Sequence, residues 1–222
     1  MKNRCLPRCY ITGAGEFCET ILPGQGDFII AADGGYEALV SRGIEPDLIV
    51  GDFDSLATGL LDIEADDPRI IRSNVEKDDT DMMLAVKQGL SRGYKIFILN
   101  GGAGGRLDHT VANMQILTYI AENNARGTLL GDGIFITAVK NDEIKFDERM
   151  LKGSTISIFC AGDKAEGITL KGLKYPLKNA TLTSDYPLGV SNEFTGAPAV
   201  ISVRSGTLLI IWEIGGKVRF SH

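Results

Sequence analysis

The sequence has few cysteines, which disulfide-linked proteins need. It also has none of the long apolar runs that are typical of exported or membrane-spanning proteins. It has 222 residues, among them four cysteines, two histidines and one tryptophan. No apolar run is long enough for a signal peptide or a membrane-spanning helix, so we expect a cytoplasmic protein that does not bind membranes. Cys5, Cys9, Cys18 and Cys160 are spaced neither as a disulfide framework nor as a paired zinc motif.

The sequence also lacks an excess of basic residues. The formal net charge is -6, and the lysines and arginines are spread along the chain. Proteins that bind a nucleic-acid backbone do so with a basic surface, so nucleic acid is not an expected partner.

Two familiar catalytic patterns are missing. His109 and His222 are the only histidines, and no Ser/His/Asp or Cys/His set is readable around them. Covalent catalysis is therefore not indicated. The glycine-rich run from Gly101 to Arg106 is not a Walker A loop, because no GK[ST] follows it.

Short apolar runs in the first part of the chain alternate with segments of helical pattern, which is typical of a βαβ sheet. Predicted strands span residues 9–12, 28–32, 48–50, 69–73, 95–99 and 128–130, and predicted helices span 35–42, 79–92 and 110–123. Several strand runs are apolar at every position, as expected when both faces of a parallel sheet are covered.

The pattern changes after about residue 139. Short alternating or β-branched runs at 154–159, 167–170, 180–184 and 199–214 are separated by glycines and prolines, which favours an antiparallel sandwich or barrel. We therefore predict an α/β chain of two domains: an N-terminal parallel α/β sheet domain over residues 1–139, and a smaller antiparallel domain over residues 140–222.

Aspartates directly follow the predicted strands, at the carboxyl ends where open parallel sheets bind ligands. Asp33 follows FIIAA, Asp52 and Asp54 follow LIVG, and Asp78 and Asp81 share helical i,i+3 spacing. Carboxylates gathered at one edge repel each other unless a hard cation neutralises them, and Mg²⁺ prefers such oxygen ligands. The set therefore indicates a magnesium site, although helix capping or loop polarity explains any single aspartate as well.

The run from Gly101 to Arg106, followed by Asp108 and His109, is richer in glycine than an ordinary connection between a strand and a helix. Glycines let backbone N–H groups approach phosphate oxygens, and an arginine can clamp a phosphate by two hydrogen bonds. Tight turns need glycines too, and a histidine after a helix-capping aspartate is more often structural than catalytic. Taken with the aspartates, the loop indicates ATP-dependent phosphoryl or pyrophosphoryl transfer.

A set of motifs then occurs in the order and spacing of one known family. The motifs are DGG at 33–35, PDLIVGDFDS at 46–55, KDDTD at 77–81, GGRLDH at 104–109, GLKYPL at 172–177 and GVSNEF at 189–194. Together they resemble the thiamine pyrophosphokinase (thiamine diphosphokinase) family over nearly the whole chain.

The resemblance implies an N-terminal α/β nucleotide domain and a C-terminal thiamine-binding β-sandwich domain. It also implies a homodimer whose sites lie between the first domain of one subunit and the second domain of its partner. In the implied reaction, the hydroxyl of thiamine attacks the β-phosphorus of ATP and gives thiamine diphosphate and AMP, with Mg²⁺ as cofactor.

By the same resemblance, Asp52, Asp54, Asp78 and Asp81 hold Mg²⁺ or orient the thiamine hydroxyl, and Asp54, Asp78 and Asp81 are the expected catalytic residues. The expected nucleotide-binding residues are Asp33, Gly34, Gly102, Gly104, Gly105, Arg106, Asp108 and His109. Ser191 and Asn192 are expected at the polar edge of thiamine, and Phe194 is expected to stack on it. Trp212, in the apolar run LLIIWEI, is assigned to the core.

Two other interpretations stay open. A transferase with the same metal and phosphate chemistry but another alcohol acceptor would carry the same first domain. A non-catalytic sensor of thiamine or a nucleotide would keep the fold without turnover, although so many carboxylates are costly for a protein that only binds.

Overall fold

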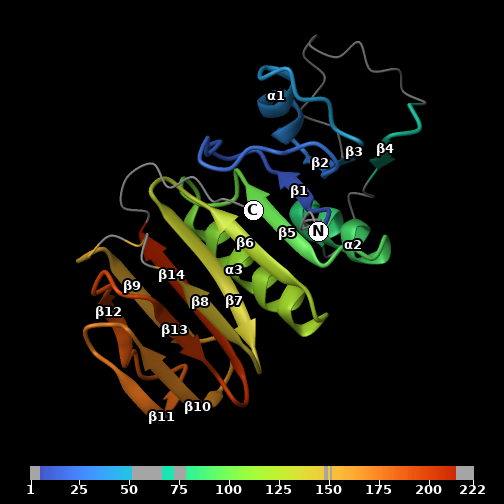
Figure 1. The fold of residues 1–222 in the computed structure, drawn as a ribbon. Helices are drawn as coiled ribbons and strands as arrows, with labels where there is room; N and C mark the ends of the chain where they lie inside the picture. Colours follow the sequence, from blue (N-terminus) through green and yellow to red (C-terminus); the bar gives the residue numbers. More distant parts are fainter. Residues whose placement is uncertain (1–5, 52–66, 73–78, 148–149, 151, 214–222) are drawn as a thin grey trace, which may run out of the picture.

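The computed structural model describes residues 6–51, 67–72, 79–147, 150 and 152–213 (Figure 1). Within these residues the chain forms a ten-stranded sheet, a four-stranded sheet and three helices. The large sheet contains β1 (Cys9–Thr12), β2 (Phe28–Ala32), β3 (Leu48–Gly51), β4 (Ile70–Arg72), β5 (Ile96–Asn100), β6 (Arg126–Leu130), β7 (Ile134–Lys140), β9 (Thr155–Cys160), β12 (Gly189–Glu193) and β14 (Thr207–Glu213). The small sheet contains β8 (Glu143–Phe146), β10 (Lys164–Lys171), β11 (Leu177–Thr183) and β13 (Ala199–Ser202), and the helices are α1 (Gly35–Val40), α2 (Asp81–Ser91) and α3 (Leu107–Glu122).

The large sheet runs through both predicted domains. Its strand order is β12-β9-β14-β7-β6-β5-β1-β2-β3-β4, and the six strands from β6 to β4 are parallel to one another. From β6 to β12 each pairing is antiparallel. The small sheet, in the order β11-β10-β13-β8, is antiparallel throughout. Parallel strands with helices, followed by an antiparallel sandwich, confirm the predicted fold class.

Helices cover both faces of the parallel strands, which explains their continuous apolar runs. Along β2, Ile30 packs in the cluster that contains the apolar side chains of α2 and α3, whereas the next residue, Ala31, packs against Leu39 of α1. Successive residues of a strand point to opposite faces, so α1 lies on one face and α2 and α3 lie on the other. None of the three helices is long and apolar enough to cross a membrane.

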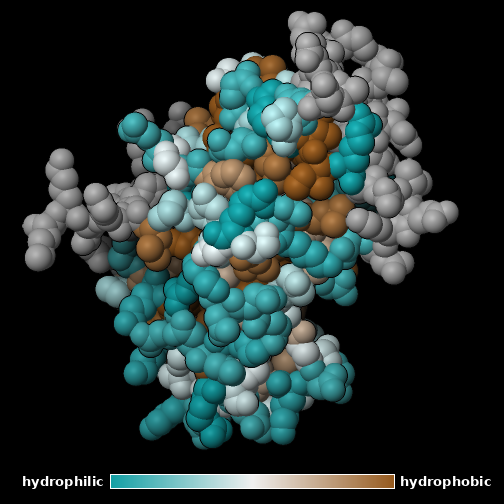
Figure 2. Space-filling model, turned by 90° about the vertical axis from the view of Figure 1, so that its right-hand side faces the viewer, coloured by the Kyte–Doolittle hydropathy of each residue, from teal (hydrophilic) through white to brown (hydrophobic). Residues whose placement is uncertain are grey.

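The exposed residues are distributed unevenly. On the face shown in Figure 2, hydrophilic residues dominate the lower half, and hydrophobic residues gather in the upper half, where Figure 1 has the α/β elements.

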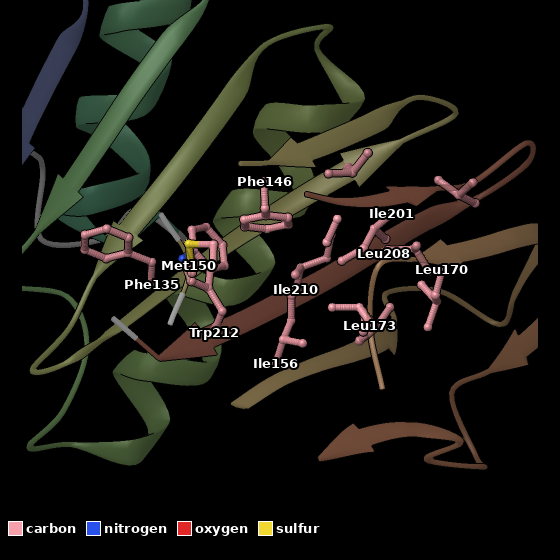
Figure 3. Close-up of a cluster of buried hydrophobic side chains, with 14 of the residues drawn as sticks. Phe135, Phe146, Met150, Ile156, Leu170, Leu173, Ile201, Leu208, Ile210 and Trp212 are labelled. Carbon is pink, nitrogen blue, oxygen red and sulfur yellow. The ribbon is translucent and has the colours of Figure 1, made fainter. Parts of the chain in front are cut away.

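An apolar cluster fills the space between the two sheets. Phe146 and Ile201 of the small sheet face Leu208, Ile210 and Trp212 of β14 (Figure 3). The ring centroids of Phe146 and Trp212 are 5.3 Å apart at an interplanar angle of 76°, an edge-to-face geometry that aromatic pairs favour. Trp212 is 5% exposed, so its assignment to the core is confirmed.

The structure corrects several predicted boundaries. The predicted strand 199–214 is two strands, β13 and β14, because the chain turns at Gly206, where φ is 103°. Helix α3 begins at Leu107, three residues before the predicted start. The sequence patterns missed β7, β8 and β12. The proposed division between residues 139 and 140 falls within β7 and stays a prediction.

Candidate active site

Asp33 directly follows β2 and has a strained backbone conformation. Its φ is 50°, in the left-handed region that non-glycine residues rarely adopt. Two backbone hydrogen bonds stabilise this conformation: the Asp33 N–H donates to the Val50 carbonyl at 2.8 Å, and the Tyr36 N–H donates to the Asp33 carbonyl at 3.2 Å. Such strain is typical of functional sites, and here it fixes the half-buried Asp33 at the carboxyl edge of the sheet.

The glycine-rich loop after β5 has a buried beginning and an open end. Gly101, Gly102 and Ala103 are buried, whereas Gly104 and Gly105 are exposed. Both exposed glycines have positive φ, of 85° and 62°, and a Cβ at either would have no neighbour within 4 Å. Open space beside glycine backbone is what a phosphate needs to approach main-chain N–H groups.

Arg106, Asp108 and His109 lie at the start of α3, and all three are exposed. The Arg106 guanidinium pairs with the Asp108 carboxylate at 2.6 Å. The hydrogen bonds from Arg106 lower the pKa of Asp108 to about 2, and the pairing with Asp108 raises the pKa of Arg106. The pair therefore stays charged at neutral pH, beside the open end of the glycine-rich loop.

Of the expected metal ligands, Asp81 alone lies among the described residues; Asp52, Asp54 and Asp78 lie outside them. Asp81 is the first residue of α2, whose N-cap Thr80 accepts a hydrogen bond from the Met83 N–H at 3.2 Å. In the described part of the chain, no group of three or more His, Cys, Asp and Glu side chains is arranged to hold a metal ion. The magnesium ligand set therefore stays a prediction.

The turn Gly13–Gly15 after β1 connects these parts. A Cβ on Gly34 would lie 3.0 Å from the Ala14 Cβ, and a Cβ on Gly13 would lie 2.8 Å from the Met82 side chain. On its other side, the Gly15 N–H donates to the Gly101 carbonyl at 2.9 Å. The start of α1, the start of α2 and the glycine-rich loop thus all touch the same turn, which sequence reasoning did not single out.

The second group of expected residues lies on β12. Asn192 is 3% exposed, and its side-chain amide bonds both backbone groups of Tyr175: Nδ2 donates to the carbonyl at 2.7 Å, and Oδ1 accepts from the N–H at 3.0 Å. Ser191 is exposed, with φ at 58°, and its N–H donates to Ser157 Oγ at 3.1 Å. The motifs GLKYPL and GVSNEF therefore lie side by side in the fold.

Phe194 does not lie on the exposed side of this site. Its side chain is 1% exposed, and its ring centroid lies 5.2 Å from that of Phe146 in the core. A ring that stacks on a ligand needs an open face, so burial argues against the expected stacking role. Tyr175 is the exposed aromatic beside Asn192, with 56% of its surface accessible. Its place in the GLKYPL motif was the signal that could have found it.

A cleft of about 390 Å³ lies at the opposite end of β5 and β6. Its lining includes Lys95, Arg126, Lys140 and Asp142. None of the expected site residues lines it, and Arg126 already pairs with Asp142 at 2.5 Å. The cleft is therefore not part of the candidate site at the carboxyl edge.

Comparisons with known proteins agree on one family. Residues 22–129 match the sequence model of the thiamin pyrophosphokinase catalytic domain, and residues 141–208 match that of the thiamin pyrophosphokinase vitamin B1 binding domain. Thiamine pyrophosphokinase of Bacillus subtilis is 31% identical over 183 residues, which are 82% of this chain and 85% of that protein. Thiamin pyrophosphokinase 1 of Caenorhabditis elegans is 23% identical over 84% of this chain and 79% of that protein.

Solved structures have the same fold. The crystal structure of the Bacillus subtilis thiamine pyrophosphokinase superposes with a TM-score of 0.81 and 26% identity, covering 93% of this chain and 98% of that one. The thiamin pyrophosphokinase of Geobacillus thermodenitrificans superposes with a TM-score of 0.77 and 23% identity, covering 94% and 98% of the two chains.

Proposed function

Because this chain belongs to the thiamine pyrophosphokinase family, it is an enzyme that diphosphorylates thiamine, and we propose that it uses ATP as donor and Mg²⁺ as cofactor. In the proposed reaction, the thiamine hydroxyl attacks the β-phosphorus of ATP, the bond from that phosphorus to the α-phosphate oxygen breaks, and AMP leaves. The observation that carries the proposal is the open glycine-rich loop between the carboxyl end of β5 and the start of α3.

We assign the nucleotide phosphates to this loop. Gly102, Gly104 and Gly105 would offer backbone N–H groups, and Arg106 would add a cationic fork for the phosphate oxygens. The 16-residue helix α3 begins directly afterwards, so the positive end of its dipole favours an anion at the same place. Asp33, Gly34, Asp108 and His109 complete the proposed nucleotide site.

The donor chemistry of this edge fits a hard cation. Asp33 and Asp81 bring carboxylate oxygens to the start of α1 and α2, and Mg²⁺ prefers oxygen ligands. We propose Asp52, Asp54, Asp78 and Asp81 as the metal-binding carboxylates, with Asp54, Asp78 and Asp81 as the catalytic residues among them. Bound Mg²⁺ would neutralise the negative charge that spreads over the oxygens of the transferred diphosphoryl group.

We propose that thiamine binds at Ser191, Asn192 and Tyr175. Thiamine is flat and cationic, and the exposed Tyr175 ring can bind a cation on its π face, as it already does with Lys174 Nζ, 5.3 Å from the ring centroid. The Asn192 amide holds the Tyr175 backbone in place through two hydrogen bonds. Phe194 then supports β12 from the core, in place of the stacking role expected from its motif.

The distance between the two half-sites supports a homodimer. In the strand order of the large sheet, β12 and β5 are five strand spacings apart, which is roughly 24 Å. One chain alone would hold its thiamine and its nucleotide too far apart to react, so we propose that each site joins β12 of one subunit to the β5 edge of its partner. The exposed apolar side chains of Leu107, Val111, Leu188 and Val190 flank the two half-sites and suit burial in such an interface.

The test is to incubate the purified protein with ATP, Mg²⁺ and thiamine and to separate the products by chromatography, with thiamine-free and chelator controls. Equal amounts of thiamine diphosphate and AMP are expected. Release of ADP would contradict transfer of a diphosphoryl group, and ATP consumption without thiamine diphosphate would favour another acceptor. Binding without turnover would favour a sensor.

We also propose the cytoplasm, which supplies ATP, as the location.

A further inference from the structure

Asn100, the last residue of β5, is completely buried. Its Nδ2 donates to Tyr10 Oη at 2.7 Å and to the Cys18 carbonyl at 2.9 Å. Its Oδ1 accepts from the N–H groups of Cys18 and Gly101, each at 2.8 Å. A side-chain amide has two donor hydrogens and two acceptor lone pairs, so the hydrogen-bonding capacity of Asn100 is filled.

These bonds join two loops that leave neighbouring strands. We call residues 13–22 the β1 loop and residues 101–106 the β5 loop. Cys18 lies in the β1 loop, and Gly101 begins the β5 loop. Tyr10, which bonds Asn100, also donates to the Ile21 carbonyl at 2.8 Å, so the far end of the β1 loop is tied to the same network.

The backbones of the two loops are packed without spare room. The Gly13 N–H donates to the Asn100 carbonyl at 2.8 Å. A Cβ on Gly15 would lie 2.5 Å from the Gly101 carbonyl oxygen, and a Cβ on Gly101 would lie 2.4 Å from the Gly13 carbonyl oxygen. Since backbone atoms cannot approach more closely, the register of one loop on the other is determined by this contact together with the Asn100 amide.

The β1 loop also touches the other half of the proposed nucleotide site, because Ala14 lies against Gly34. The order across the edge is therefore Gly34, the β1 loop and then the β5 loop. A displacement of the β1 loop would change the separation of the Asp33–Gly34 turn from the exposed glycines and Arg106.

We propose that Asn100 is a positioning residue for diphosphate transfer: it holds the β1 and β5 loops in the register that the nucleotide phosphates require. The role rests on the proposed function, since it needs the nucleotide to bind between these loops. Asn100 is buried and acts only through the loops.

Two substitutions separate shape from hydrogen bonding. Asn100→Asp keeps the shape and the Oδ1 acceptor, but it turns an oxygen instead of an N–H donor toward the Cys18 carbonyl. Asn100→Leu removes both the Nδ2 donor and the Oδ1 acceptor, and it leaves the Cys18 and Gly101 backbone groups without their partner. Both variants are expected to raise the KM for ATP by about tenfold or more, to lower kcat, and to leave the KM for thiamine within about twofold.

A matched control is Thr137→Val. Thr137 is 5% exposed in β7, and its hydroxyl donates a hydrogen bond to the Gly127 carbonyl at 2.6 Å. The variant loses one buried side-chain bond in the same sheet, away from both loops, so it is expected to lower the melting temperature and leave the KM for ATP unchanged. A merely structural Asn100 would give the same result as this control.

Each outcome decides the proposal. Folded Asn100→Asp with a KM for ATP and a kcat within about twofold of the wild type overturns it. If both Asn100 variants fail to fold, Tyr10→Phe replaces them, because it removes one partner of the amide and keeps the ring. An unchanged KM for ATP in Tyr10→Phe then overturns the proposal, and a rise of a few-fold supports it.

Failure of the proposed function is detected separately. The wild type is first assayed for thiamine diphosphate; without this product, the reaction is wrong and the kinetic arms are replaced by calorimetric titration with ATP and Mg²⁺. Weaker ATP binding by Asn100→Asp than by the wild type and Thr137→Val still supports the role in loop positioning, and equal binding overturns it.

Discussion

Arg106 and Asp108 bind each other at the start of α3, where Arg106 Nη2 lies 2.6 Å from Asp108 Oδ2 and Nε donates to Oδ1 at 3.2 Å. The side chains are 71% and 64% exposed, so the pair contributes little to stability. Its consequence is orientation, because the carboxylate holds the guanidinium beside the exposed glycines of the β5 loop.

Asp108→Asn is therefore expected to raise the KM for ATP several-fold while the melting temperature stays the same, since surface changes of this kind move stability by less than about 0.5 kcal/mol. Steady-state kinetics and thermal melts measure the two effects. Arg106→Lys is the companion variant, because it keeps the charge and loses the planar fork. An unchanged KM for ATP in both variants would remove the pair from the proposed nucleotide site.

Asp81→Asn and Asp54→Asn are expected to abolish turnover with the fold preserved, because each would replace a proposed, charged metal ligand by a neutral one. Asp79→Asn is the matched control in the same motif, since Asp79 pairs with Lys87 at 2.6 Å. Product formation and circular dichroism are the measurements. Near-normal rates in the Asp81 and Asp54 variants would contradict their assignment.

Tyr175→Ala and Phe194→Ala are expected to have opposite effects. Tyr175 is exposed, so its loss should weaken thiamine binding by about 1 to 3 kcal/mol and leave stability nearly unchanged. Phe194 is buried, so its loss should lower the free energy of unfolding by about 3 to 5 kcal/mol. Calorimetric thiamine titration and urea unfolding separate the two. If Phe194→Leu folds normally and loses thiamine affinity, the stacking role expected from the motif is restored.

Alkaline pH is expected to destabilise the fold through two buried groups. Burial raises the pKa of Tyr10 from 10.0 to about 12 and that of Cys9 from 9.0 to about 12. Because the pKa of each group is higher in the folded state, its protonated form contributes fully to the free energy of unfolding below pH 9. This contribution is lost as the pH rises toward 12, and each pH unit above the unfolded pKa lowers the free energy of unfolding by about 1.4 kcal/mol per group. Urea unfolding between pH 8 and 11 measures the loss, and Tyr10→Phe should show a smaller dependence than the wild type. A flat profile would contradict the burial argument.

Two impaired variants are expected to recover activity when they are mixed, if each is assayed at substrate concentrations where it alone is nearly inactive. Arg106→Ala would damage the proposed nucleotide half-site, and Tyr175→Ala would damage the proposed thiamine half-site. If each site joins two subunits, half of the randomly exchanged dimers are mixed and half of their sites are intact, so about a quarter of the wild-type activity should return. Each variant alone, taken through the same exchange, is the control. No recovery in proven mixed dimers would show that the sites do not join two subunits.

The parallel half of the fold was predictable because its strands are buried on both faces. β1 and β3 are buried at every position, so burial appears in the sequence as continuous apolar runs. β12 was missed because it is an edge strand in which Val190 and Ser191 are exposed, and its sequence GVSNE lacks an apolar stripe.

Residues of the candidate site could be proposed from the sequence only where motifs or strand ends marked them. The alternation along VSNEF, with Asn192 and Phe194 two residues apart and both buried, could have indicated that Phe194 faces the core. Asn100 gave no local signal, because its partners Cys18 and Tyr10 are 82 and 90 residues away in sequence. Hydrogen bonds of such long range follow from the fold and from no short pattern.

β14 is the last strand that the structure describes, yet it lies in the interior of the large sheet, between β7 and β9. During synthesis, the edges of β7 and β9 that pair with β14 therefore stay unpaired until residues 207–213 have left the ribosome. Unpaired edges invite pairing with other chains. A nascent chain stalled between β9 and β14 should consequently depend on chaperones, whereas the parallel strands, complete by residue 130, can already form their sheet.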